Sequence, residues 1–253
     1  MKIVRTIAEL TFPTGTRGLV ATMGAFHAGH VSLFEAARAE NDVVVVSLFV
    51  NPAQFGSAED LARYPRDEER DARVAADAGV DVLFVPDAGE LYPSGYQTWV
   101  EVEELGRVLE GEFRPGHFRG VATVCCKLFN LVRPQRAYFG QKDAQQVAVV
   151  KRMVLDLHLG VDIRVLPTVR DEDGLALSSR NAYLSAAERE AALALPRALA
   201  TKDAQRAREL LSGNGLAVDY VEVAEFEPRV LAAAVRLGRT RLIDNVVLEG
   251  DER

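Results

Sequence analysis

The stretch that decides the fold is Gly18-Leu19-Val20-Ala21-Thr22-Met23-Gly24-Ala25-Phe26-His27-Ala28-Gly29-His30, followed by a helical pattern over Val31–Ala37. Its first four residues are an apolar run typical of a short buried strand. His27 and His30 are three residues apart, so both imidazoles fall on one face of the first helical turn. That turn has unpaired backbone N–H groups and a partial positive charge, and Gly29 lets a ligand approach the backbone. The stretch therefore predicts a phosphate-binding turn between a strand and a helix.

The composition excludes several classes of protein. The 253 residues suffice for one large core or for a main domain with a smaller partner, and 48% of them are hydrophobic. The net charge of −7 argues against general nucleic-acid binding, although a local basic pocket for one anion is compatible with it. Since no apolar run is as long as a membrane span and residues 1–6 do not resemble a signal peptide, we expect no membrane segment and a cytoplasmic location. Cys125 and Cys126 are expected to be small core residues on a helix, without a disulfide or a metal.

Apolar runs alternate with helical patterns through the first two thirds of the chain. Strands are expected at 18–21, 43–50, 80–86, 137–140 and 161–166, and helices at 31–37, 67–78, 118–132 and 143–157. Strands separated by helices predict right-handed βαβ units and a doubly wound parallel sheet, which is a Rossmann-like α/β fold.

The pattern changes after about Val169. Ser185 and Glu188 have the spacing of a capping box and predict the start of a helix, which Pro196 should end or kink. A second helical stretch should end at the glycines of residues 213–215.

Two alternating stretches, 218–223 and 240–247, then predict half-buried strands. We therefore expect a main domain over residues 1–168 and a smaller C-terminal α+β domain over residues 169–253.

Polar residues follow the ends of several predicted strands. Asn51 and Gln54 place neutral amides where ligands collect in parallel sheets, or they organise an ordinary turn. Lys142 could point a compact cation at a phosphate, while Asp143 could cap the next helix or accept ribose hydroxyls. Residues 177–181 could wrap an anion or form a solvated loop.

The segment 110–120 is rich in glycine and of mixed charge. It could be a mobile cover over a cleft or a connecting loop without function.

The turn with two histidines resembles the signature of the nucleotidyltransferase superfamily, which includes the class I aminoacyl-tRNA synthetases. Eight motifs in order, spanning nearly the whole chain, resemble one family of it, the pantothenate synthetases or pantoate–β-alanine ligases. They are residues 22–30, 49–55, 64–66, 116–121, 139–146, 167–170, 173–181 and 236–245. The chain departs from the family in having Ala21 in place of the usual proline and in a shorter region from Ser185 to Arg236.

The resemblance implies an ATP-dependent, AMP-forming ligation. The carboxylate of pantoate attacks the α-phosphate of ATP, and the amine of β-alanine then attacks the pantoyl adenylate to give pantothenate. Mg²⁺ is expected on the phosphates without a tight protein cage, and the family predicts a homodimer.

The same resemblance carries over residue roles. His27, His30 and Lys142 are the implied catalytic residues, with His30 as proton donor. Gln54 and Gln146 are expected to bind pantoate, with Gln54 near the β-alanine site. The implied nucleotide-binding positions are Met23, Gly24, Ala25, Phe26, His27, Ala28, Gly29, His30, Gly140, Gln141, Lys142, Asp143, Val169, Leu177, Ser178, Ser179 and Arg180.

Two other functions stay open at this point. One is an adenylyltransferase of the same superfamily that acts on a small acid or phosphate ester and keeps AMP on its product. The other is a nucleotide-binding module without catalysis, although such a module would be expected to have lost some of these polar residues.

Overall fold

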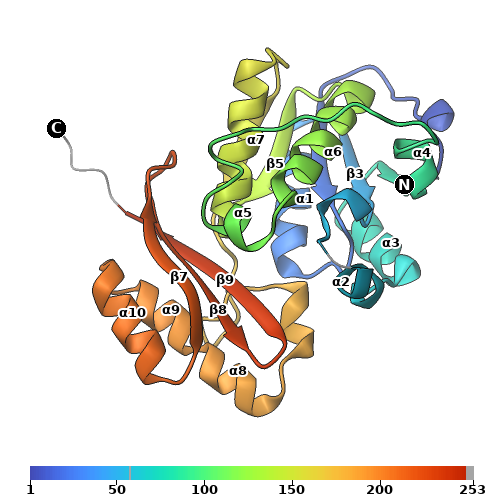
Figure 1. Ribbon diagram of the computed structural model, residues 1–253. Coiled ribbons are helices and arrows are strands. Elements are labelled where there is room, and N and C mark those ends of the chain that lie inside the picture. Colours follow the sequence, from blue (N-terminus) through green and yellow to red (C-terminus); the bar gives the residue numbers. More distant parts are fainter. Residues whose placement is uncertain (57, 249–253) are drawn as a thin grey trace. The chain divides into compact units, whose positions relative to one another are not determined.

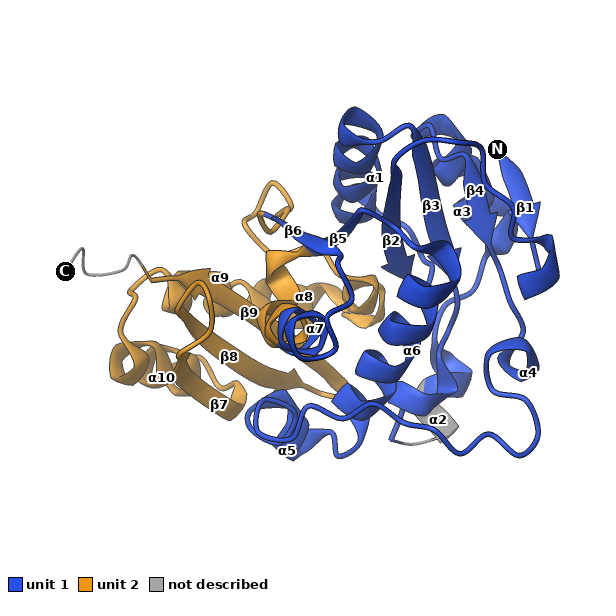
Figure 2. Cartoon of the chain, turned by 90° about the horizontal axis from the view of Figure 1, so that it is seen from above, with its two compact units in different colours: residues 1–139, 149–166 blue, residues 140–148, 167–253 orange. Residues whose placement is uncertain are grey.

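The protein is represented by a computed structural model that describes residues 1–56 and 58–248 (Figure 1). The chain divides into two compact units, one of residues 1–139 and 149–166 and the other of residues 140–148 and 167–253 (Figure 2). Each unit contains its own β-sheet.

The first unit is built on a six-stranded parallel sheet of order β1-β4-β3-β2-β5-β6. Its strands are β1 (Lys2–Val4), β2 (Arg17–Thr22), β3 (Val43–Leu48), β4 (Val82–Phe84), β5 (Arg136–Gly140) and β6 (Asp162–Leu166). β2 lies between β3 and β5, so the order of the sheet reverses beside β2. In such a sheet, ligands bind outside the carboxyl ends of the strands at the point of reversal. The predicted doubly wound sheet is confirmed.

Seven α-helices lie within the described part of residues 1–166, and the last of them begins in the second unit. They are α1 (Ala28–Glu40), α2 (Ala58–Arg63), α3 (Glu68–Asp77), α4 (Ala88–Leu91), α5 (Glu110–Phe113), α6 (His117–Val132) and α7 (Ala144–Asp156). Phe34 of α1 and Ala75 of α3 pack on Val44 and Val46 in one buried cluster, and α6 contacts β2. β3 is buried along residues 43–47, as a central parallel strand with both faces covered should be.

Short 3₁₀ turns connect several of these elements. They are η1 (Ile7–Glu9), η2 (Pro52–Gln54), η3 (Gln141–Asp143) and η4 (Ser179–Tyr183). Three of them contain residues that the sequence assigns to binding.

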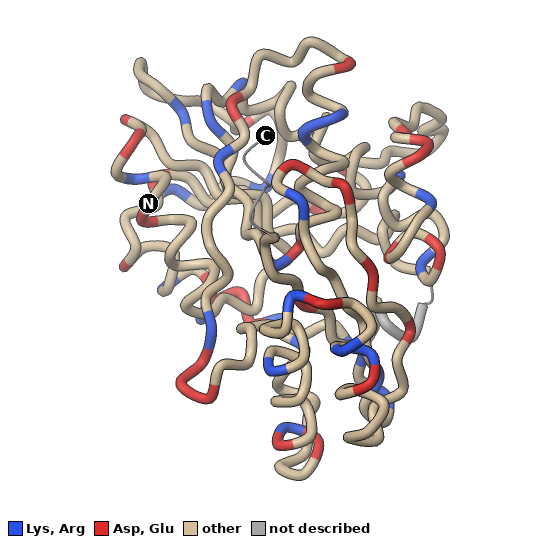
Figure 3. Tube along the Cα trace, turned by 90° about the vertical axis from the view of Figure 1, so that its left-hand side faces the viewer, with Lys and Arg blue, Asp and Glu red and all other residues tan. Residues whose placement is uncertain are grey.

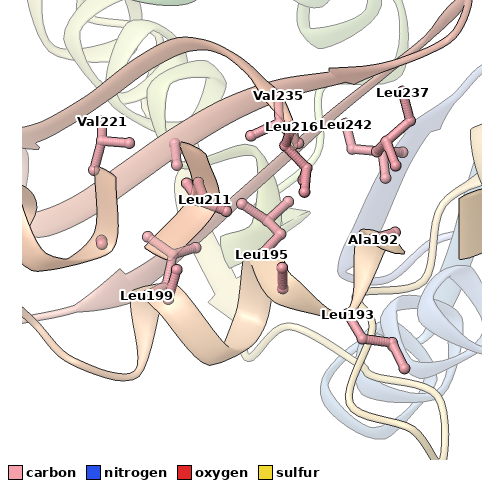
Figure 4. Close-up of a cluster of buried hydrophobic side chains, with 14 of the residues drawn as sticks. Ala192, Leu193, Leu195, Leu199, Leu211, Leu216, Val221, Val235, Leu237 and Leu242 are labelled. Atoms are coloured by element: carbon pink, nitrogen blue, oxygen red, sulfur yellow. The ribbon is translucent and has the colours of Figure 1, made fainter. Parts of the chain in front are cut away.

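The second unit contains a three-stranded antiparallel sheet of order β7 (Ala217–Ala224), β8 (Val230–Leu237) and β9 (Thr240–Val247). Helices α8 (Ala186–Ala192), α9 (Ala194–Leu199) and α10 (Ala204–Gly213) precede it. Their apolar side chains and those of the strands form a common core, with Leu195 and Leu199 fully buried (Figure 4). The predicted smaller α+β part is confirmed.

Two details of this unit differ from the sequence prediction. The helix that Ser185 caps ends at Ala192, and Pro196 does not break it but lies in the first turn of α9, where its missing N–H has no helical partner to lose. β8 was not predicted, because Val230–Val235 are all buried and show no alternation.

Charged residues of both signs are spread along the chain, and both cysteines lie on a helix. Lys and Arg are interspersed with Asp and Glu along the trace (Figure 3). Cys125 on α6 is buried and Cys126 is partly buried, and both are free thiols. Burial, and to a lesser degree the neighbouring Cys126, raises the pKa of the Cys125 thiol to about 12.

Replacing Leu195 with alanine should destabilise the second unit. The side chain is 1% exposed within the core of Figure 4, so truncation leaves a cavity and should lower the free energy of unfolding by about 2–5 kcal/mol. Leu155→Ala is the control, because Leu155 is 62% exposed and its loss should cost no more than about 0.5 kcal/mol. Urea unfolding of both variants measures this, and equal stabilities would contradict the assignment of the core.

Candidate functional site

The first part of the site is the turn after β2, residues 23–30, which we call the histidine turn. His27 is the N-cap of α1, and its Nδ1 accepts a hydrogen bond from the Gly29 N–H at 3.1 Å. Three residues on, the Nδ1 of His30 accepts from the His27 N–H at 3.3 Å. The two imidazoles thus form a reciprocal capping box, a role that Ser and Glu usually fill.

This capping box determines the tautomers of both histidines. A backbone N–H can only donate, so each Nδ1 must be unprotonated, and each neutral ring carries its proton on Nε2. The ring centroids are 4.2 Å apart. The histidine turn therefore has two neutral Nε2–H donors close together at the positive end of a helix.

The backbone of the histidine turn is strained and held by a distant carboxylate. Gly24 has φ +90° and Ala25 has φ +55°, and the latter is rare for a residue with a side chain. Asp71 of α3, 1% exposed, accepts the Ala25 N–H at 2.7 Å and the Phe26 N–H at 2.8 Å. Arg70 donates to the Phe26 carbonyl at 3.0 Å.

Sequence reasoning missed Asp71. The residue lies in a charged helical stretch, and no local pattern distinguishes it from its exposed neighbours.

Gln54 lies at the end of η2, after β3, and is buried. Its Nε2 donates to Met23 Sδ at 2.9 Å and its Oε1 accepts from Asn51 Nδ2 at 3.2 Å. An amide nitrogen carries two hydrogens, so Gln54 has a second one to donate. The neighbouring His117 bonds the Gln54 carbonyl through Nδ1 at 2.9 Å.

The segment 110–120 forms α5 and the first turn of α6 rather than a loop. Gly120 lies so close to η2 that an added Cβ would overlap the carbonyl of Ala53, and Asn51 donates to the Gly120 carbonyl at 3.1 Å. This packing orients the turn that contains Gln54.

A cavity of about 320 Å³ opens beside these residues in the first unit, at the carboxyl ends of β2, β3 and β4. Its lining combines apolar residues such as Met23, Phe49 and Pro52 with one arginine and four carboxylates, those of Arg66, Asp67, Glu68, Asp71 and Asp87. Its volume is in the range of small-molecule sites.

The second unit brings together three of the predicted phosphate contacts. Lys142 lies in η3, which we call the lysine turn, and Ser178 and Arg180 lie at η4. All three line one small cavity of about 10 Å³, roughly the space of one water molecule. The Ser178 hydroxyl accepts the Arg180 N–H at 3.3 Å and caps η4, and Ser179 is partly exposed beside it.

Val169 and Leu177, both predicted at the nucleotide, face each other in a short hairpin. The Leu177 N–H donates to the Val169 carbonyl at 3.0 Å, and Arg170 and Ala176 form the adjacent bridge. The structure therefore brings these two residues together.

The remaining predicted positions also lie in the second unit. No other atom lies within 4 Å of where a Cβ of Gly140 would stand, so a ligand could approach the backbone from that side. Gln146 is partly exposed in the first turn of α7. The Gln141 amide donates to Asn245 at 3.1 Å, and Asp143 lies 3.6 Å from Lys142 Nζ.

Among the described residues, no group of three or more His, Cys, Asp or Glu side chains is arranged to hold a metal ion. In the same part of the chain, no helix is both long and apolar enough to cross a membrane.

Fold and site together are those of a nucleotide-using α/β enzyme with a histidine turn at a helix N-terminus. A sequence profile of one family, described as pantoate-beta-alanine ligase, matches residues 2–247. Pantothenate synthetases of Acetivibrio thermocellus and Roseiflexus sp. are 49% and 52% identical, each aligned over 98% of this chain and 100% of that protein. The chain therefore belongs to the pantoate–β-alanine ligase family, the enzymes that form pantothenate.

Solved structures agree with this assignment. The pantothenate synthetase of Thermus thermophilus matches with a TM-score of 0.94 and 46% identity, over 98% of this chain and 99% of that one. A pantoate-beta-alanine ligase of Francisella tularensis, described as complexed with beta-gamma ATP and beta-alanine, matches with a TM-score of 0.88 and 36% identity, over 98% and 97%.

Asp71→Asn should impair the histidine turn. One carboxylate oxygen would become an NH₂ group that cannot accept from the Ala25 or Phe26 N–H, and leaving a buried donor unsatisfied costs about 1–3 kcal/mol. We expect the KM for ATP to rise by about tenfold, because a loss of about 1.4 kcal/mol in binding is a factor of ten.

Asp77→Asn is the matched control, since Asp77 is exposed on the same helix. If steady-state kinetics show the same KM for ATP in both variants, Asp71 does not organise the turn.

Proposed function

We propose that this chain condenses pantoate with β-alanine through a pantoyl-adenylate intermediate. A pantoate carboxylate oxygen attacks the α-phosphorus of ATP, and the bond from that phosphorus to the bridging oxygen breaks, releasing pyrophosphate. The β-alanine amine then attacks the acyl carbon, AMP leaves, and the amine loses a proton. Activation is needed because a carboxylate has no good leaving group, whereas the adenylate has one.

The observation that carries this proposal is the pair of Nε2–H donors on His27 and His30. Two neutral donors at a helix N-terminus suit phosphate oxygens, and they strengthen as negative charge builds up on the leaving pyrophosphate. The His30 Nε2–H is the group we assign as donor to that oxygen. The backbone of residues 23–29 supplies further N–H groups for the phosphates.

In the second unit we assign the cations to the phosphates. Lys142 and Arg180, with the hydroxyls of Ser178 and Ser179, bind phosphate oxygens, a role supported by the proximity of Lys142, Ser178 and Arg180 around one small space. Asp143 and the backbone of Gly140 bind the ribose, and Gln141 contributes through its backbone N–H, since Asn245 engages both its side chain and its carbonyl. Val169 and Leu177 lie along the adenine.

We assign Gln54 and Gln146 to pantoate. Neutral amides bind hydroxyls and a carboxylate without adding charge, and this favours a small hydroxy acid over the phosphate ester of another adenylyltransferase. The buried amide of Gln54, hydrogen-bonded to Met23 and Asn51, supports its assignment.

Mg²⁺, a homodimer and a cytoplasmic location complete the proposal. Mg²⁺ is assigned to the phosphates of the nucleotide, with water as its other ligand. When bound there, the ion neutralises phosphate charge. The dimer rests on the family resemblance, and the location rests on the composition and the N-terminal sequence.

The reaction is tested by omission. The purified chain, given ATP, Mg²⁺, pantoate and β-alanine, should release AMP and pantothenate, and leaving out β-alanine should stop turnover after the adenylate has formed. An adenylylated product without free AMP would instead support the other adenylyltransferase.

His30→Asn and Lys142→Ala should each lower turnover by about 10²–10³-fold, as for other lost transition-state donors. Asparagine can keep the cap with its Oδ1 in place of Nδ1 but has no group at Nε2, so the loss reports the distal donor. His158→Ala is the control because His158 is exposed after α7. Wild-type turnover of His30→Asn or Lys142→Ala would remove that residue from the mechanism.

Gln54→Ala should weaken pantoate binding more than ATP binding. We expect the KM for pantoate to rise by about tenfold. A hydrogen bond in a buried site contributes about 1.4 kcal/mol to binding, which is a factor of ten in affinity. Titration of each substrate separately measures the difference. An unchanged pantoate affinity would contradict the assignment.

A further inference from the structure

Asn245 of β9 holds the lysine turn by every polar group of its side chain. Its Nδ2 donates to the carbonyls of Gln141 and Lys142, both at 2.9 Å, and its Oδ1 accepts from Gln141 Nε2 at 3.1 Å. The residue is 5% exposed. Three hydrogen bonds from one buried side chain thus converge on two consecutive residues of the turn.

Only asparagine supplies this set of groups at this length. Its amide has one acceptor and two donor hydrogens, which match one amide donor and two carbonyls of the turn. An aspartate would turn acceptors toward both carbonyls, and an apolar residue would leave the carbonyls unsatisfied.

Asn245 is itself fixed by an ion pair whose carboxylate is buried. Its N–H donates to Asp244 Oδ1 at 2.8 Å, and Asp244, 2% exposed, binds Arg170 through two bonds of 2.7 and 3.0 Å. Arg170 also donates to the Gly174 carbonyl at 3.2 Å. The ion pair ties the hairpin that contains Val169 to the strand that contains Asn245, all within the second unit.

We propose that Asn245 is a positioning residue for adenylate formation, acting through Lys142. This rests on the phosphate-binding role proposed above for Lys142. A lysine is a point charge on a flexible stem, so the place of its backbone decides how often its ammonium reaches the phosphates. A displacement of about 1 Å in a positioning group can cost about 10²-fold in rate.

The test separates the two half-reactions. Asn245→Ala should lower the rate of ATP–pyrophosphate exchange in the presence of pantoate by about tenfold or more, because that exchange needs Lys142 in place. The KM for β-alanine should change by less than about twofold, since the amine is used after pyrophosphate has left. A change in the fold alone would lower the rates of both half-reactions by the same factor. Such equal losses would overturn the proposal.

Asn214→Ala is the matched control. Asn214 is another asparagine of the second unit that donates to a backbone carbonyl, that of Leu210 at 2.8 Å, but it caps α10. Its exchange rate should equal that of the unchanged protein. Asn245→Ser, which retains one donor, should lie between Asn245→Ala and the unchanged protein and is used in its place if the alanine variant does not fold.

A double-mutant cycle with Lys142→Ala distinguishes this inference from the proposed function. If Asn245 acts through Lys142, then Asn245→Ala should cost less than about twofold in the Lys142→Ala background. Full additivity of two slow single variants would overturn the role of Asn245 and leave that of Lys142 intact. A Lys142→Ala variant with normal exchange would instead overturn the proposed role of Lys142 and, with it, this inference.

Discussion

The site depends on how the first backbone N–H groups of α1 are hydrogen-bonded. A helix begins with four N–H groups that have no helical partner. Two imidazoles cap this helix through Nδ1, and the same bonds hold the two rings close together and set their tautomers. Had serine and glutamate formed this box, the helix would be capped equally well but would present no distal N–H donor. Helix capping and the proposed phosphate contact are therefore two properties of one pair of residues.

Each functional turn is held by a buried polar group from a distant part of the sequence. Asp71 holds the strained backbone of the histidine turn, His117 holds the turn of Gln54, and Asn245 holds the lysine turn. In each case the holding group bonds backbone atoms rather than only the side chain that is thought to act. Such contacts fix where a side chain starts, which matters most for long residues such as lysine.

Local patterns made much of this structure predictable. Several elements follow from residues that are close together in the sequence, and all of them are present. They are strands β2, β7 and β9 and the cap of α8 at Ser185. The histidine turn was predictable for the same reason, since strand, turn and helix are consecutive.

What could not be predicted depends on partners remote in sequence. Nothing near Asp71 shows that its carboxylate is buried, because the groups it binds lie some 45 residues earlier. β8 has no alternation to detect since both of its faces are covered, and the segment 110–120 was ambiguous because its packing against η2 decides its structure. Single-sequence patterns report local periodicity, and these features are set by tertiary contacts.

The donors that we assign to the phosphates differ in charge between the two units. In the first unit, the donors assigned to the phosphates are backbone N–H groups and neutral imidazoles, while the formal cations Lys142 and Arg180 lie in the second. A site composed only of cations would bind ATP and pyrophosphate strongly at every stage, and uniform binding of this kind does not accelerate the chemical step. Fixed neutral donors gain most where negative charge grows, which is on the oxygen of the leaving pyrophosphate. In the capping box each Nδ1 accepts a backbone N–H, so the donor that each ring presents is an uncharged Nε2–H.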